Sequence, residues 1–195
     1  LIRLRKRNPK IASKLFLNLA MRLENSYQQT HQKMLNNLQD SGNYGAELKG
    51  RFNRKFDDLF SGIKERRKQK WIESSTLIFM TPEGILDATD IEDYSWMMVK
   101  SGHVEIRCRK ENAYQTLALR KGGDLIGRAE MLTSKESGII ELKALEDSEI
   151  LCISPEQLEQ LKRKHVRLTA EWTEQLVCVL SDQLEEANTF LKFTI

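Results

Sequence analysis

The sequence has few of the residues that mark secreted, disulfide-stabilised or membrane-spanning proteins. It contains three prolines, three cysteines and 7% aromatic residues in 195 positions. Cys108, Cys152 and Cys178 are scattered and form no Cys-x-x-Cys pair, which argues against a disulfide framework or a zinc site. Each lies in an apolar pattern, so we expect three buried thiols in a reducing, cytoplasmic compartment. No run of eighteen apolar residues exists, so we expect no membrane-spanning helix, and membrane contact only through a parent protein.

Catalytic signatures are also missing. The sequence has no Gly-x-Ser-x-Gly, no His-Glu-x-x-His and no phosphate-binding loop of the Walker type. His31, His103 and His165 are far apart and are typical of surface or turn positions. We therefore expect a protein that is not an enzyme and that holds no metal or other cofactor.

The charge is distributed unevenly along the chain. The formal net charge is only +3, but residues 1–70 carry a balance of +11 and residues 71–195 a balance of −8. Such a split fits a basic arm that meets nucleic acid or anionic lipid. It equally fits a basic half that docks on the acidic half or on another acidic partner, and the composition leaves both open.

Helical patterns dominate the first third of the chain. After the start signal Asn8-Pro9, apolar residues recur every four positions, which predicts a helix to about Leu38 that packs on a core. They are Ile11, Leu15, Leu19, Leu23 and Tyr27, flanked by Ala12, Phe16 and Ala20. Gly42, Gly45 and Gly50 predict a linker. A second helix is predicted from about Leu48 to Trp71.

After Trp71 the pattern changes to short strands separated by turns. Their spacing is typical of a barrel or sandwich. The clearest are Thr76–Met80, Trp96–Val99, Val104–Cys108, Gln115–Leu119, Ile139–Ala144 and Glu149–Ile153. Ser154-Pro155-Glu156-Gln157 then predicts a capping box and a helix to Lys164, followed by a long helix from Arg167 to Leu191. Trp71, Trp96 and Trp172 fit core positions.

The helical segments at the two ends align without a gap when shifted by 157 positions. Leu1 and Leu4 then coincide with Leu158 and Leu161, and Ile11 with Leu168. Further matches are Leu19 with Leu176, Leu23 with Leu180, and Arg5-Lys6-Arg7 with Lys162-Arg163-Lys164. We expect residues 1–40 to be the closing helices of a preceding module, and the rest a second module.

Residues 96–153 resemble the core of the cyclic-nucleotide-binding domain, the family of catabolite activator proteins, protein kinase A regulatory subunits and cyclic-nucleotide-gated channels. Trp96–Ile106 resembles its strand-Gly-strand signature, and Leu119–Gly127 its Gly-Asp-x-x-Gly turn. Ala144–Ile150 is similar to the segment after the family's phosphate-binding cassette. Pro155–Lys164 and Arg167–Leu191 resemble its two C-terminal helices.

The resemblance does not extend to the ligand-binding residues. Gly127 keeps a family glycine, but Arg128 stands where the family has a ribose-binding Glu, and Gly138 where it has the phosphate-binding Arg. Ile139 and Ile140 replace small residues beside that Arg. A buried phosphate needs a charge-assisted donor, so these substitutions predict a degenerate pocket.

The resemblance implies an α+β fold, a jelly-roll β-barrel of about eight short strands with flanking helices. We expect residues 1–40 to be the closing helices of a preceding module, 41–72 a linker and leading helix, and 73–195 the cyclic-nucleotide-binding-like domain. The family's DNA readers continue into a helix-turn-helix domain after the last helix, and none follows here before Ile195, so either the sequence is a fragment cut at that point or the protein does not read DNA.

The predicted function is a cytoplasmic regulatory module of a larger protein, such as a transporter, a channel or a multi-domain regulator. It contacts a protein partner or a second copy through Pro9–Leu38 and Arg167–Leu191 and does not bind cyclic nucleotide. One alternative is a sensor for cyclic AMP, cyclic GMP or another anion that uses Arg128 and Lys135. Another is a basic adaptor for nucleic acid or anionic membrane through Arg3–Lys10 and Lys64–Lys70.

Overall fold

The computed structural model describes residues 2–41, 55–87, 90, 93–94, 96–110, 113–126 and 139–194. Eight antiparallel strands in these residues form two four-stranded sheets with the orders β1-β8-β3-β6 and β2-β7-β4-β5. The strands are β1 (Thr76–Met80), β2 (Ile85–Asp87), β3 (Trp96–Ser101), β4 (His103–Lys110), β5 (Ala113–Lys121), β6 (Leu125–Ile126), β7 (Ile139–Ala144) and β8 (Ser148–Ile153).

These strand orders are those of an eight-stranded jelly roll, in which two Greek keys contribute strands to both of two facing sheets. The expected jelly-roll fold is therefore confirmed, although the described strands form two facing sheets and no closed barrel. The interior between the sheets is apolar: Met97 and Val99 of one sheet pack with Val104 and Ile106 of the other.

The sheet that contains β3 and β8 is buried on both faces. In β3, Met97 and Val99 point into the sandwich, and Trp96 and Met98 point the opposite way. Because successive side chains of a strand alternate between faces, burial of both faces explains why Trp96–Val99 is a continuous apolar run. An exposed outer face would require polar residues at every second position.

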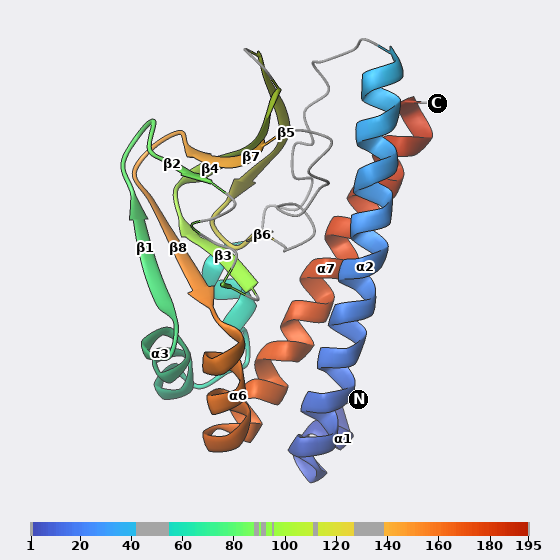
Figure 1. Ribbon diagram of the computed structural model, residues 1–195. Coiled ribbons are helices and arrows are strands. Elements are labelled where there is room, and N and C mark those ends of the chain that lie inside the picture. The colour runs from blue at the N-terminus through green and yellow to red at the C-terminus, as the bar shows by residue number, and fades with distance from the viewer. Residues whose placement is uncertain are drawn as a thin grey trace.

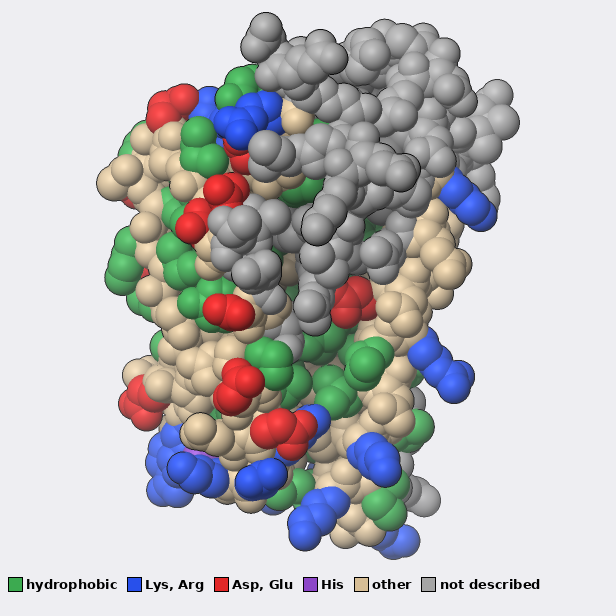
Figure 2. Space-filling model, in the orientation of Figure 1, with side chains coloured by type: hydrophobic (Ala, Val, Ile, Leu, Met, Phe, Trp, Pro, Cys, Tyr) green, Lys and Arg blue, Asp and Glu red, His purple; other side chains and the backbone are tan. Residues whose placement is uncertain are grey.

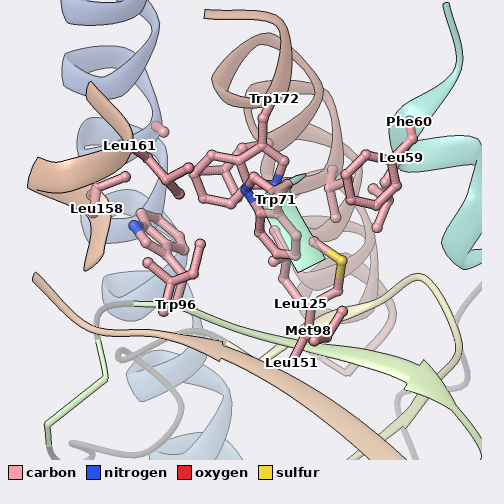
Figure 3. Packing of buried hydrophobic residues seen from close by; sticks show 14 of the residues in the cluster. Leu59, Phe60, Trp71, Trp96, Met98, Leu125, Leu151, Leu158, Leu161 and Trp172 are labelled. Atoms are coloured by element: carbon pink, nitrogen blue, oxygen red, sulfur yellow. The ribbon is translucent and has the colours of Figure 1, made fainter. Parts of the chain in front are cut away.

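Helices cover this outer face. They are η1 (Phe56–Phe60), α3 (Glu65–Glu73), α6 (Pro155–Lys164) and α7 (Val166–Thr194). Trp71 of α3 and Trp172 of α7 are both 1% exposed, with ring centroids 5.2 Å apart, and they lie over Trp96 of β3 (Figure 3). The predicted core positions of all three tryptophans are confirmed.

Two helices precede this module, α1 (Ile2–Arg7) and α2 (Pro9–Ser41). α2 lies along α7, and the two run in the same direction, from the N-terminal end of the molecule towards the C-terminus (Figure 1). Both predicted helix starts are confirmed. Asn8 accepts from the amide of Ile11 at 3.4 Å, and Ser154 and Gln157 form the capping box of α6.

Two sequence-based predictions about the leading helices are wrong. The helix expected from Leu48 to Trp71 is not continuous, because η1 and α3 are separated at Gly62, whose φ of +74° is left-handed. The second error concerns the first part of the apolar stripe of α2: Ile11, Leu15 and Leu19 are 54%, 45% and 39% exposed, whereas the flanking Ala12, Phe16 and Ala20 and the last stripe residue Tyr27 are buried as expected. The small residues are selected because they let α2 approach α7 closely.

Two glycines hold the turns of the sandwich. Gly102 has φ +82°, and a Cβ there would lie 2.5 Å from the carbonyl oxygen of Asp147. Gly123 has φ +96°, and a Cβ would lie 2.7 Å from the backbone of Lys55. Both positions therefore require glycine, for the backbone angle and for the close approach of a neighbouring segment.

Candidate functional site

Residues 127–138 connect β6 to β7, and the predicted pocket residues Gly127, Arg128 and Gly138 lie outside the described residues. The residues on either side are described. Ile126 at the end of β6 is fully buried, and Ile140 in β7 is 2% exposed; both point into the sandwich interior. Of Ile139, only the backbone is described, and it pairs with Arg109 of β4.

The interior beside this connection is filled with hydrocarbon. Ile140 packs with Cys108, Ala118 and Met97, and all of these side chains are less than a tenth exposed. An anionic ligand placed against these residues would lose its hydration without gaining a hydrogen-bond donor from them. Any donor to a phosphate must therefore come from other residues.

One buried cation lies at the edge of this interior. Arg120 is on β5, two positions beyond Ala118 and thus on the same face, and is only 2% exposed. Its Nη2 donates a hydrogen bond to the hydroxyl of Tyr27 in α2 at 2.7 Å. Burial of a guanidinium is costly without a partner, so this contact fixes the position of α2 relative to β5.

A second buried hydrogen bond joins the sandwich to α7. Gln183 is 8% exposed, and its Nε2 donates to the carbonyl oxygen of Leu125 at 2.9 Å. Leu125 is the first residue of β6, two positions before the connection to β7 begins. Both long helices are therefore hydrogen-bonded to the strands that lead into residues 127–138.

An ion pair is buried on the opposite face of the other sheet. Arg107 of β4 donates to Glu141 of β7 from Nε at 3.0 Å and from Nη2 at 2.8 Å. Arg109 lies 3.2 Å from the same carboxylate, and the Arg107 guanidinium lies 4.0 Å from the ring centroid of Tyr114. Alternation places this cluster outside the sandwich interior, so it stabilises the sheet and does not face the expected pocket.

A basic cleft of about 520 Å³ lies where α3 meets the junction of α6 and α7. Its charged lining comes from both sides and consists of Lys64, Arg66, Arg67, Lys70, Lys164, His165 and Arg167. Lys and Arg side chains gather at this end of the molecule (Figure 2). The cleft combines the predicted basic run Lys64–Lys70 with residues 164–167, and none of the described residues of the other predicted run, Arg3–Lys10, lines it.

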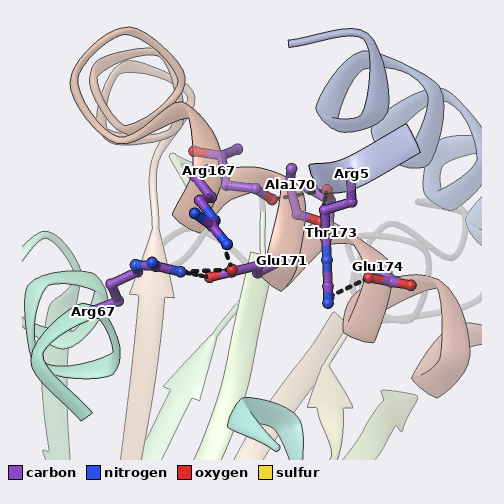
Figure 4. Close-up of polar contacts among 8 residues, drawn as sticks. Arg5, Arg67, Arg167, Ala170, Glu171, Thr173 and Glu174 are labelled. Carbon is purple, nitrogen blue, oxygen red and sulfur yellow. Dashed lines mark hydrogen bonds and ion pairs between the residues drawn. The ribbon is translucent and has the colours of Figure 1, made fainter. Parts of the chain in front are cut away.

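One carboxylate neutralises part of the cleft. Glu171 of α7, 4% exposed, accepts from Arg67 at 2.6 Å and lies 3.4 Å from Arg167 (Figure 4). Lys64, Arg66, Lys70 and Lys164 form no ion pair with any described residue. Lys68 on the same helix differs, because a hydrogen bond to Asp57 at 2.6 Å raises its pKa. The cleft thus keeps cations without anionic partners among the described residues.

The remaining sequence-predicted positions are spread over the molecule. His103 is exposed, and its Nδ1 lies 2.5 Å from Oε1 of Glu146. His165 is the C-terminal cap of α6, directly after its last residue Lys164. Burial is confirmed for Cys108 and Cys152 but is wrong for Cys178, which is exposed on α7. The described residues hold no group of three or more side chains suited to a metal ion. No helix in the described part of the chain is long and apolar enough to cross a membrane.

Sequence reasoning missed Arg120, Tyr27 and Gln183. Only Arg120 had a usable signal in the sequence, because it is a charged residue two positions after Ala118 and therefore on the same strand face. Tyr27 belongs to the predicted apolar stripe, which indicates burial but no hydrogen bond, and Gln183 is an ordinary polar position of an amphipathic helix. Their role follows from how the helices dock, which the sequence does not specify locally.

Comparison with known proteins gives one family match. Residues 81–165 match the family described as the cyclic nucleotide-binding domain. A search of curated proteins finds no match.

Several solved structures are similar. A CooA double mutant from Carboxydothermus hydrogenoformans shares 19% identity with a TM-score of 0.52, over 74% of this chain and 90% of that one. The catabolite activator protein of Thermus thermophilus shares 23% identity with a TM-score of 0.48, over 69% of this chain and 62% of that one. The imidazole-bound CO-dependent transcription factor CooA of C. hydrogenoformans shares 18% with a TM-score of 0.44, over 72% and 58%. Identities this low concern the fold alone.

Proposed function

We propose that this chain, whose residues 81–165 form a domain of the cyclic nucleotide-binding family, is a non-enzymatic regulatory module that acts through its long helices. The observation that carries the proposal is the pair of buried hydrogen bonds, Arg120 to Tyr27 and Gln183 to the Leu125 carbonyl. They join α2 and α7 to the strands on the N-terminal side of the expected ligand cassette. A displacement of that cassette changes the packing of both helices, which are the surfaces offered to a protein partner or a second copy.

We further propose that the module does not bind cyclic nucleotide in the manner of its family. Arg128 and Gly138 replace the ribose-binding Glu and phosphate-binding Arg, and Ile140 fills the adjacent interior. Loss of one member of a buried charged pair costs about 2–5 kcal/mol. At about 1.4 kcal/mol per tenfold change, that loss weakens the affinity about 30- to 4,000-fold, so a micromolar dissociation constant rises to between tens of micromolar and a few millimolar.

Calorimetric titration with cyclic AMP and cyclic GMP tests this proposal. We expect no saturable heat from the native chain. The double variant Arg128→Glu, Gly138→Arg restores the family pair and is expected to gain binding, whereas Arg128→Ala, Gly138→Ala is the matched control that gains none. Micromolar binding by the native chain, abolished by Arg128→Ala, would instead support the sensor alternative with Arg128 as its cation.

The basic cleft favours a second candidate function, an adaptor for a polyanion such as nucleic acid or an anionic membrane. Lys64, Lys70 and Lys164 converge on it without carboxylate partners among the described residues. A polyanion bound there releases counterions, so its affinity falls steeply with salt.

Titration of a DNA duplex and of phosphatidylserine vesicles at increasing salt tests the adaptor function. Lys70→Glu and Lys164→Glu each reverse a cleft charge and are expected to weaken binding and to reduce the salt dependence. Lys33→Glu changes an exposed charge on α2 and is the matched control. Equal losses from all three variants would indicate a non-specific charge effect and no function for the cleft.

A further inference from the structure

The exposed face of α2 carries a row of large apolar side chains. Ile11 is 54% exposed, Leu15 45% and Leu19 39%, whereas Leu23, next in the row, is half-buried and already packs against the core of the described module. Residues at this spacing form one stripe along a helix. Contiguous exposed apolar surface of this kind marks a site of contact. We call Ile11, Leu15 and Leu19 the α2 stripe.

The 157-position shift relates the α2 stripe to residues of known environment. It places Ile11, Leu15, Leu19 and Leu23 on Leu168, Trp172, Leu176 and Leu180 of α7. All four α7 residues are at most 2% exposed and pack on the helix-covered face of the sandwich. The residues exposed on α2 are therefore the counterparts of those through which α7 closes its own module.

The helix boundaries agree with the same shift. α1 ends at Arg7 and α6 at Lys164, and α2 begins at Pro9 and α7 at Val166. Arg7 and Lys164 are 157 positions apart, and so are Pro9 and Val166. The break between α1 and α2 therefore falls at the same point of the repeat as the break between α6 and α7. This match of boundaries is independent of the side-chain pattern from which the shift was found.

The faces that join α2 to α7 correspond as well. Phe16 and Ala20 on α2 coincide with Thr173 and Val177 on α7, and Ser13 coincides with Ala170. Phe16 packs with Ala170 and Val177 between the two helices. The two helices thus use equivalent faces against each other and run in the same direction (Figure 1). Such a pair is the arrangement of two related subunits around a two-fold axis.

We infer that α1 and α2 are the closing helices of a preceding β-sandwich of the same kind, and that this sandwich covers the α2 stripe. In the present module, α6 follows β8 after the single residue Ser154. The covering sandwich is therefore the segment encoded immediately before Leu1, and it docks on α2 as the described sandwich docks on α7. The inference does not depend on whether either pocket binds nucleotide.

Thiol accessibility, compared between residues 1–195 and a chain extended at its N-terminus by the inferred sandwich, tests this inference. Leu15→Cys reports on the stripe, and Met21→Cys, also exposed and equivalent to the exposed Cys178, is the matched control. Both are made in a Cys178→Ser background. In residues 1–195 alone we expect both thiols to be labelled rapidly. In the longer chain we expect the thiol at 15 to be labelled about 100-fold more slowly, because a covered site must open first, and the thiol at 21 to be unchanged.

Three outcomes would overturn the inference. Equal labelling at position 15 in both chains means that no upstream segment covers the stripe. Protection in residues 1–195 that rises with protein concentration assigns the stripe to a second copy. An encoded sequence without a Gly-Asp turn 157 positions before Gly123-Asp124 removes the preceding sandwich itself. Leu19→Cys repeats the measurement at a second stripe position and guards against a local effect of one substitution.

Discussion

Arg107 and Glu141 face each other across β4 and β7 with less than a tenth of either side chain exposed. Loss of one partner leaves the other charge buried, which costs about 3–5 kcal/mol. We expect Glu141→Leu to lower the free energy of unfolding by an amount in this range, measured by chemical denaturation. The exposed Arg109 near this carboxylate can turn to water and adds little.

Two controls separate charge burial from lost packing. The double variant Arg107→Met, Glu141→Leu removes both charges and should recover most of the lost stability. Glu159→Ala breaks an exposed pair with Lys162 and should cost at most about 1 kcal/mol. A double variant as unstable as Glu141→Leu would show that the site depends on shape and hydrogen bonds and not on charge compensation.

The three cysteines should differ sharply in reactivity. Burial raises the pKa of the Cys152 thiol to about 12, so its reactive thiolate is scarce at neutral pH. Cys108 is also buried, whereas Cys178 is exposed. We expect a disulfide reagent to label one thiol in the native protein, identified as Cys178 by peptide mapping, and three after unfolding. Rapid native labelling of Cys152 would contradict its buried position in the sandwich.

At the scale of elements, one hydroxyl contributes a buried hydrogen bond to the contact between α2 and β5. Tyr27→Phe keeps the ring but removes the acceptor of this hydrogen bond from Arg120. Loss of a buried hydrogen bond to a charged group costs about 1–3 kcal/mol. We expect this loss in the free energy of unfolding, with faster amide hydrogen exchange along α2 than along α7.

Tyr114→Phe is the matched control for that prediction. Tyr114 is 54% exposed and meets Arg107 through its ring, so removal of its hydroxyl should change stability by less than about 0.5 kcal/mol. Equal effects of the two substitutions would mean that the Arg120 contact does not hold α2 in place.

An element can be predicted from the sequence when the residues that determine it are close together in the chain. The capping box at Ser154 and the strand Val104–Cys108 are predicted from local patterns, and both predictions are confirmed. The continuous helix up to Trp71 fails because its apolar spacing is equally satisfied by η1 and α3, folded back on the sheet around Gly62. The burial of Ala12 and Ala20 in place of Ile11 follows from a helix pairing that a hydropathy pattern does not contain.

The site was less predictable than the fold for the same reason. Arg120 is recognised as a contact of α2 only when residues 93 positions apart are brought together. The basic cleft likewise needs both Lys64–Lys70 and Lys164–Arg167, which the chain separates by the whole sandwich. The substitutions at Arg128 and Gly138 are visible in the sequence alone, and their effect on binding stays a prediction.

At the scale of the whole molecule, α2 covers a face of α7 that no other described element shields. Phe16 of α2 packs against Ala170 and Val177, and Ala12 lies in the same cluster. Deletion of residues 1–41 exposes this apolar face of α7 to water. Burial of apolar area drives association, so the shortened chain should pair with a second copy through α7.

We expect residues 42–195 to dimerise, measured by sedimentation velocity across a concentration series, and residues 1–195 to show weaker association. Val177→Lys places a charge in the middle of the exposed α7 face and should return the shortened chain to a monomer. Cys178→Lys adds the same charge at the neighbouring exposed position and should not. If α2 and α7 are equivalent, α2 occupies the face of α7 on which the α7 helix of a second copy could pack. A shortened chain that stays folded and monomeric at every concentration would therefore contradict this equivalence.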